Sequence, residues 1–213
     1  MNSCKFIGSG AILLGLAMPG LAATVTIGTS DTFGKGLAPL FGTLINFDDQ
    51  TPLSTLSAAA YSSEGVSSIT NGDASEPLLV LPYSDQSPPN YISTGASDNY
   101  AGNITFTFAN LTNNVGLGIS EDGVTPVTLT AFGAGNNVLG SFTETVPSTT
   151  FNAYYVISDT TFDIKSVSVS AAQNLAIDDV QLAGVPEPRS LALSAAGLAL
   201  LLLAMKQRGK TAA

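Results

Sequence analysis

A two-residue alternation of apolar and hydroxyl side chains constrains the fold of this chain more than any other feature. In its clearest instance Ile104, Phe106 and Phe108 alternate with Thr105 and Thr107. Successive side chains of an extended strand point to opposite faces, so this pattern buries one face of a sheet and exposes the other. The pattern therefore predicts a half-buried β-strand and argues against a helix.

The same reasoning extends along the chain and indicates an all-β fold. Strands are predicted at 24–29, 42–47, 66–70, 78–83, 102–110, 115–119, 127–132, 138–146, 151–158, 164–170 and 175–182. The segment Ala134–Asn137 is typical of a hairpin turn, and further turns are expected at 36–41 and 54–60. Residues 83–100 contain two adjacent prolines and are predicted to form a long loop. Short strands joined by turns favour an antiparallel, jelly-roll-like β-sandwich.

The first 23 residues have the layout of a secretory signal peptide, whose apolar part we expect to be helical. A short polar start carries Lys5, an apolar run follows, and the segment ends in the small residues Ala22 and Ala23. We expect signal peptidase to cleave after one of these two alanines. An uncleaved anchor is the alternative, but the apolar run is short for a membrane span of about 20 residues. The only cysteine, Cys4, leaves with the signal.

The other end of the chain has three consecutive parts. Val185, Pro186, Glu187 and Pro188 precede an apolar run at about 190–205, and three basic residues follow it. The prolines keep the apolar helix from extending backwards, and the basic tail favours the cytoplasmic side of a membrane. Residues 24–184 then form the extracellular domain.

This three-part ending resembles the PEP-CTERM sorting signal of Gram-negative bacteria. The resemblance covers residues 185–213 and implies processing at the VPEP segment by an exosortase. It also implies export across the inner membrane, a membrane-anchored precursor inserted transiently through its C-terminal helix, and a final place on the cell surface or in an exopolysaccharide matrix. An ordinary single-pass anchor is the alternative. The pieces "INFDD", "GNITFTF" and "LAIDDVQL" resemble lectin-like sandwich domains that precede such signals, which supports the fold.

The charge of the domain at residues 24–184 narrows the possible partners. It contains 2 lysines and 15 acids, a net charge of −13, and the whole chain has no histidine. Nucleic acid is excluded as a partner because no surface can neutralise phosphates. Histidine-dependent catalysis is excluded as well. Serine and threonine supply 40 of the 161 residues, which suits exposed strand faces.

Four acids near the two ends of the domain are the candidate metal ligands: Asp48, Asp49, Asp178 and Asp179. Strict alternation places Asp178 on the same face as Val180 and Leu182, where a lone carboxylate needs a partner. If the strand before Asp48 lies beside the last strand, these acids can form an oxygen cage for a structural Ca²⁺. Carboxylates that cap turns or face water are the alternative.

The long loop and one tyrosine pair offer the candidate carbohydrate contacts. Tyr91, Asp98, Asn99 and Tyr100 combine flat aromatic faces with hydrogen-bonding groups, as sugar binding requires. In the pair Tyr154–Tyr155 one ring must face away from the core. Packing within the loop and the core is the alternative for both sets.

These features predict a non-enzymatic surface or matrix protein with a lectin-like sandwich that binds carbohydrate, including exopolysaccharide. The alternative is a secreted carbohydrate-active hydrolase or lyase, which needs only two carboxylates. No catalytic residue is assigned, because the four glutamates of the domain are scattered through turn-like or strand sequence: Glu64, Glu76, Glu121 and Glu144.

Overall fold

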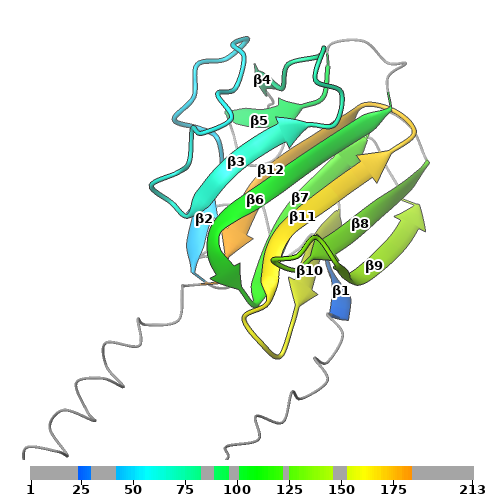
Figure 1. Ribbon diagram of the computed structural model, residues 1–213. Helices are drawn as coiled ribbons and strands as arrows, with labels where there is room; N and C mark the ends of the chain where they lie inside the picture. The colour runs from blue at the N-terminus through cyan, green and yellow to red at the C-terminus, as the bar shows by residue number, and fades with distance from the viewer. Residues whose placement is uncertain are drawn as a thin grey trace, which may run out of the picture.

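The computed structural model describes residues 24–29, 42–82, 89–95, 101–121, 125–145 and 153–183, the first segment by its backbone alone. Within these segments the chain forms 12 β-strands in two antiparallel sheets (Figure 1). The predicted all-β sandwich is therefore confirmed. Among the described residues no helix is long and apolar enough to cross a membrane.

The seven-stranded sheet contains both the first and the last strand. Its path is β1 (Thr24–Thr29), β10 (Ala153–Ser158), β7 (Asn114–Glu121), β12 (Leu175–Leu182), β5 (Asn90–Ser93) and β4 (Leu79–Pro82). The seventh strand, β2 (Thr43–Ile45), also pairs with β12 and sets Ile45 opposite Val180. The strand before Asp48 thus lies beside the last strand.

The five-stranded sheet forms the other layer and lies in front in Figure 1. Its order is β3 (Val66–Asn71), β6 (Gly102–Thr112), β11 (Ile164–Ala171), β8 (Pro126–Phe132) and β9 (Val138–Thr145). β8 and β9 form the predicted hairpin. In its turn Asn136 has a φ of 58°, and the N–H of Gly133 donates to the carbonyl of Asn137 at 2.9 Å.

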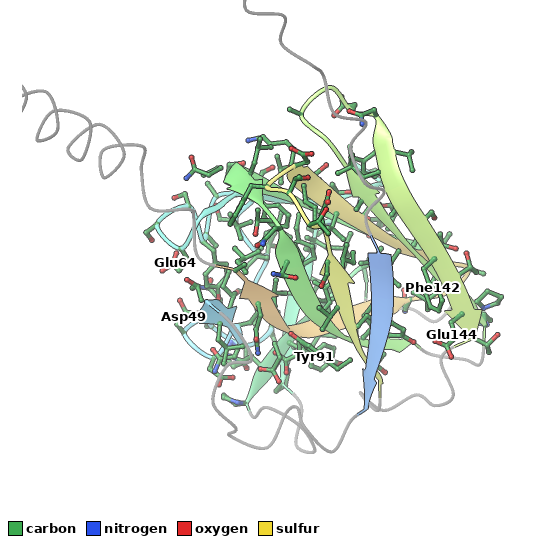
Figure 2. All side chains as sticks on the ribbon, turned by 90° about the horizontal axis from the view of Figure 1, so that it is seen from below. Asp49, Glu64, Tyr91, Phe142 and Glu144 are labelled. Atoms are coloured by element: carbon green, nitrogen blue, oxygen red, sulfur yellow. The ribbon has the colours of Figure 1, made fainter. Side chains whose placement is uncertain are left out.

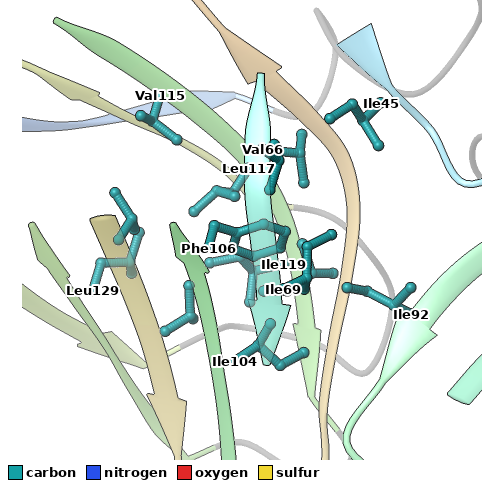
Figure 3. Close-up of a cluster of buried hydrophobic side chains, with 14 of the residues drawn as sticks. Ile45, Val66, Ile69, Ile92, Ile104, Phe106, Val115, Leu117, Ile119 and Leu129 are labelled. Carbon is teal, nitrogen blue, oxygen red and sulfur yellow. The ribbon is translucent and has the colours of Figure 1, made fainter. Parts of the chain in front are cut away.

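The core lies between the sheets and is built from the inward half of each alternating pattern. Ile104 and Phe106 of β6 meet Leu117 and Ile119 of β7, and all four are fully buried (Figure 3). Burying such a side chain stabilises a fold by about 1.5–3 kcal/mol. Alternation therefore both defines the strands and supplies the core.

One predicted element is wrong. Residues 83–100 are not one continuous loop, because β5 lies within them and pairs with β4 and β12. The segment before β5 contains Pro88 and Pro89, which hid a strand of only four residues. The sequence signal for this strand is Ile92, which is fully buried, while its neighbours Tyr91 and Ser93 lie on the opposite face of the sheet.

Several predictions fall on residues outside the described segments. These are the signal peptide with Ala22 and Ala23, the turn at 36–41, the segment from Val185 to Pro188 and the C-terminal apolar run. The turn-rich character expected for 54–60 is present, because hydrogen-bonded turns run from residue 57 to residue 64.

Candidate functional site

A β-bulge interrupts the last strand at its two adjacent acids. Asp178 lies opposite Gly118 of β7, but the next residue in register is Gln181, opposite Gly116. Asp179 takes up the extra length with a φ of 51°, in the left-handed region that L-residues rarely adopt. The bulge changes the direction in which the following side chains point.

The predicted direction of Asp178 is therefore wrong. Val180 and Leu182 belong to the core, as does each chain neighbour of Gly118. Directly opposed residues of a sheet share a face. Asp178 thus shares the outer face of the seven-stranded sheet with Gly118, and strict alternation fails because of the bulge.

Asp178 is nonetheless buried, with 2% of its surface exposed. Its Oδ1 accepts a hydrogen bond from the backbone N–H of Asp179 at 2.7 Å. Burial, and after it the negative charges of Asp179 and Asp48, raise the pKa of Asp178 to about 9, although the Asp179 hydrogen bond lowers it. At neutral pH this carboxyl group carries a proton unless a cation compensates its charge.

Asp48 connects the end of β2 to the start of β5. Its Oδ1 accepts the backbone N–H of Asn90 at 3.1 Å, and its Oδ2 accepts the side-chain amide of Asn46 at 2.6 Å. Burial raises the pKa of Asp48 more than these bonds lower it. The structure thus brings Asp48 near Asp178, close enough for the two charges to interact.

Asp49 points elsewhere. Its Oδ1 accepts the hydroxyl of Tyr61 at 2.5 Å, and its Oδ2 accepts the side-chain amide of Gln50 at 3.0 Å. The Tyr61 ring in turn packs edge-on against Phe47, with ring centroids 5.4 Å apart. Asp49 therefore orients a buried tyrosine, and of the two predicted acids in this loop only Asp48 faces the last strand.

Asn90 belongs to this neighbourhood, and the sequence analysis did not find it. Its side-chain amide donates to the carbonyls of Phe47 at 3.3 Å and Gln50 at 2.9 Å. It was missed because its strand was not predicted. Within the described segments, no three Asp, Glu, His or Cys side chains are grouped so as to hold a metal ion. The calcium site stays a prediction.

The tyrosine pair is not an exposed platform. Tyr155 belongs to the core, whereas Tyr154 lies on the outer face and is only 2% exposed. Its ring lies over Gly116, where an added Cβ would meet the Tyr154 hydroxyl at 2.0 Å, and that hydroxyl donates to the carbonyl of Asp179 at 3.3 Å. Tyr154 therefore packs across β7 onto the bulge.

Of the four carbohydrate contacts predicted within residues 83–100, only Tyr91 is described. It lies on β5 of the seven-stranded sheet and is half-buried (Figure 2). Asp98, Asn99 and Tyr100 lie outside the described residues. Their role in binding stays a prediction.

The outward side of the five-stranded sheet carries a regular array of hydroxyl groups. In one row Thr105 of β6, Ser168 of β11 and Thr130 of β8 lie directly side by side. Thr70 of β3 and Ser141 of β9 extend this row to both edges. We call this surface the hydroxyl face; it comprises Thr70, Asn103, Thr105, Thr107, Thr128, Thr130, Ser141, Thr143, Ser166, Ser168 and Ser170.

Side chains of the hydroxyl face bond to one another. The Oγ atoms of Thr130 and Ser141 are 3.0 Å apart, and Ser168 donates to the side-chain oxygen of Asn103 at 3.0 Å. Neighbouring positions within a row are about 4.8 Å apart, the distance between adjacent strands. Successive rows are about 6.7 Å apart along the strands, the rise of two residues. None of the residues that define this face is acidic, although the domain as a whole is strongly acidic.

Two of the glutamates considered for catalysis lie far apart. Glu64 and Glu144 lie at opposite sides of the molecule (Figure 2). Glu64 is exposed in a turn, and the hydroxyl of Ser63 donates to it at 2.8 Å. Glycoside hydrolases need two carboxyl groups within about 5–9.5 Å of each other. Glu64 and Glu144 cannot act together in that way.

Comparisons with known proteins give no family for this chain. No protein-family model matches it, and no curated protein matches it. Among solved structures, the K2 cleaved adhesin domain of Lys-gingipain has 14% identity and a TM-score of 0.46, over 67% of this chain and 99% of that one. A family 29 carbohydrate-binding module from Piromyces equi has 10% identity and a TM-score of 0.38, over 76% and 91%.

An arabinose-bound α-L-arabinofuranosidase also matches, with 14% identity and a TM-score of 0.42, over 75% of this chain and 32% of that one. All three TM-scores are too low for function to follow from the likeness. The class to which the chain belongs is defined by its own two antiparallel sheets: it is a β-sandwich protein.

Proposed function

We propose that this chain is an exported, non-enzymatic protein of the cell surface or extracellular matrix whose β-sandwich binds polysaccharide. The observation that carries the proposal is the hydroxyl face. Each serine or threonine hydroxyl can donate one hydrogen bond and accept others, as the hydroxyls of a sugar do. A flat array of such groups over five strands suits an extended glycan chain.

Charge supports this surface over the rest of the domain. Matrix polysaccharides are neutral or anionic, and a domain with a net charge of −13 repels anionic polymers. Surface charges act over about 8–10 Å at physiological salt. A face without carboxylates is therefore where a glycan approaches at the lowest electrostatic cost.

The route to the surface is proposed from the two ends of the sequence. Signal peptidase removes residues up to Ala22 or Ala23, and the C-terminal apolar run holds the precursor in the inner membrane of a Gram-negative bacterium. An exosortase then processes the segment from Val185 to Pro188. The resemblance of residues 185–213 to the PEP-CTERM signal supports this route.

Binding of the purified full chain to a panel of bacterial and plant polysaccharides, in a mild detergent, tests the proposal. Ser168→Glu adds a negative charge at the centre of the hydroxyl face, and we expect it to weaken binding at least tenfold. Ser62→Glu is the matched control, because Ser62 is exposed in a turn outside this face. It should bind as the wild type does.

Tyr91→Ala separates the hydroxyl face from the loop surface predicted from the sequence. A loss of binding in Tyr91→Ala together with unchanged binding in Ser168→Glu would move the glycan site to the loop. A wild-type chain that binds no polysaccharide in the panel would refute the proposed function.

A further inference from the structure

A cleft lies at the edge of the five-stranded sheet, beside β3. The end of β3 forms one wall, and residues from the segments 55–58 and 73–78 form the others. These segments belong to the cyan loops beside β3 in Figure 1. The N–H of Ile69 in β3 donates to the carbonyl of Ala58 at 2.8 Å, so backbone bonds hold the walls together.

The lining of the cleft combines apolar and polar side chains. Leu56, Ile69 and Leu78 belong to the core and are at most 6% exposed, whereas Asp73 is exposed and Glu76 half-buried. The cleft holds about 240 Å³, which is below the 300–1,000 Å³ or so of pockets that take drug-sized ligands. This size and lining suit a single sugar residue, whose ring has apolar C–H faces and hydroxyl groups at its edge.

The acidic side of the cleft is fixed by hydrogen bonds within its own loop. The N–H and the hydroxyl of Ser75 donate to Oδ1 of Asp73 at 2.9 and 2.6 Å, and they lower the pKa of Asp73. The side-chain amide of Asn71 donates to the carbonyl of Glu76 at 3.0 Å. Asp73 therefore carries its charge at neutral pH, and a ligand pays little to order this loop.

Thr70 connects the cleft to the hydroxyl face, because it belongs to both. It lies opposite Thr105, at the end of the row that continues through Ser168 and Thr130. This row crosses the strands at right angles to their direction. A glycan chain that follows the row therefore reaches the cleft with one of its ends.

The charge of the cleft narrows the class of glycan. Asp73 and Glu76 are acidic, and none of the residues that line the cleft is basic. Carboxylates accept strong, charge-assisted hydrogen bonds from hydroxyl groups, but they repel other anions over about 8–10 Å. Of neutral and anionic polysaccharides, only the neutral ones fit this end of the row.

We propose that this cleft binds one uncharged sugar residue at the end of a polysaccharide that lies across the strands of the hydroxyl face. The sugar ring packs on Leu56, Ile69 and Leu78, and its hydroxyls donate to the carboxylates of Asp73 and Glu76. This inference rests on the proposed function, to which it adds the charge class of the glycan and its direction on the sheet.

Binding of the purified full chain to hexasaccharides of glucose, mannose, xylose and galacturonic acid tests the cleft. Ala58 is exposed and lines the cleft, so Ala58→Phe fills it, and we expect the affinity for neutral hexasaccharides to fall at least tenfold. Ala59→Phe is the matched control, because Ala59 is exposed next to it but lies outside the cleft. It should bind as the wild type does.

Glu76→Gln tests the charge of the cleft with little change in its shape. Because a hydrogen bond to a charged group is stronger than one to a neutral group, we expect the affinity for neutral hexasaccharides to fall about fivefold. The preference for neutral sugars over the galacturonic acid hexasaccharide should fall as well. Far-UV circular dichroism will verify that each variant is folded before its affinity is measured.

Several outcomes would overturn the cleft while leaving the proposed function in place. These are wild-type affinity in Ala58→Phe, an equal loss in Ala59→Phe, wild-type affinity and selectivity in Glu76→Gln, or a wild type that binds polysaccharides but no neutral hexasaccharide. Tighter binding of the galacturonic acid hexasaccharide would overturn the uncharged class. A wild type that binds no polysaccharide at all would refute both the cleft and the proposed function.

Discussion

Without metal, the buried carboxyl group of Asp178 should make this protein less stable as the pH rises. The pKa of Asp178 is raised from its ordinary value of 3.8 to about 9 in the folded protein. Between these two values the folded state binds a proton that the unfolded state has released. The contribution of this proton to the free energy of unfolding is therefore fully present below pH 3.8, and it is lost progressively as the pH rises toward about 9.

The size of the effect follows from the linkage relation. Each pH unit between the two pKa values removes about 1.4 kcal/mol of unfolding free energy. From pH 5 to pH 8 the loss is about 4 kcal/mol, a large part of the roughly 5–15 kcal/mol that stabilises an ordinary domain. The raised pKa of Asp48 acts in the same direction.

Other shifted groups titrate outside this pH interval. Burial raises the pKa of both Tyr61 and Tyr154 above their usual value, and bonds from Ser75 lower the pKa of the exposed Asp73. None of these three gains or loses a proton between pH 5 and pH 8. The slope in this interval therefore reports mainly on Asp178.

Urea unfolding of the chelator-treated full chain at pH 5, 6.5 and 8 measures the effect. We expect the wild type to lose stability across the series, and Asp178→Asn, which cannot ionise, to lose much less. Asp73→Asn is the control, since it removes an exposed acid and should keep the wild-type slope. A wild-type stability that is constant from pH 5 to pH 8, or an equal slope in Asp178→Asn, would refute the reasoning.

Two further predictions concern packing and processing. Gly116→Ala should destabilise the protein by about 1–3 kcal/mol in urea unfolding, because the added Cβ would displace the Tyr154 ring. Gly135→Ala is the control and should be nearly neutral, because the atom nearest to its added Cβ is 3.6 Å away. Intact-mass analysis of the protein exported by its native host should show a chain that begins at Ala23 or Thr24. The same chain should lack the residues after the segment from Val185 to Pro188. Exported protein that ends at Ala213 would contradict the sorting signal.

The fold could be predicted from the sequence because its strands obey local rules. In β6 every second side chain is buried and its neighbours carry hydroxyls, so burial can be inferred from the residue types alone. The hairpin between β8 and β9 was equally visible, because Asn136 tolerates the left-handed conformation that the turn needs. Sheet order was not predictable, since it depends on contacts between residues far apart in the chain.

The candidate metal site was predicted only in part, and the failures have physical causes. The acids at both ends of the domain were found because carboxylates without lysine partners need other partners. The choice between Asp48 and Asp49 depends on Tyr61, a tertiary contact. Asn90 was missed because a four-residue strand behind two prolines leaves little periodic signal.

The direction of Asp178 was predicted wrongly although a local signal for the bulge existed. β7 reads Val-Gly-Leu-Gly-Ile from Val115 to Ile119, so its outward positions hardly carry side chains. Glycine at alternate positions of a strand indicates that something packs closely on that face. Tyr154 covers one of these glycines, and Asp178 lies opposite the other. Two adjacent aspartates in the strand beside such a face are better explained by a bulge, which removes both from the core, than by uninterrupted alternation, which would bury one of them there.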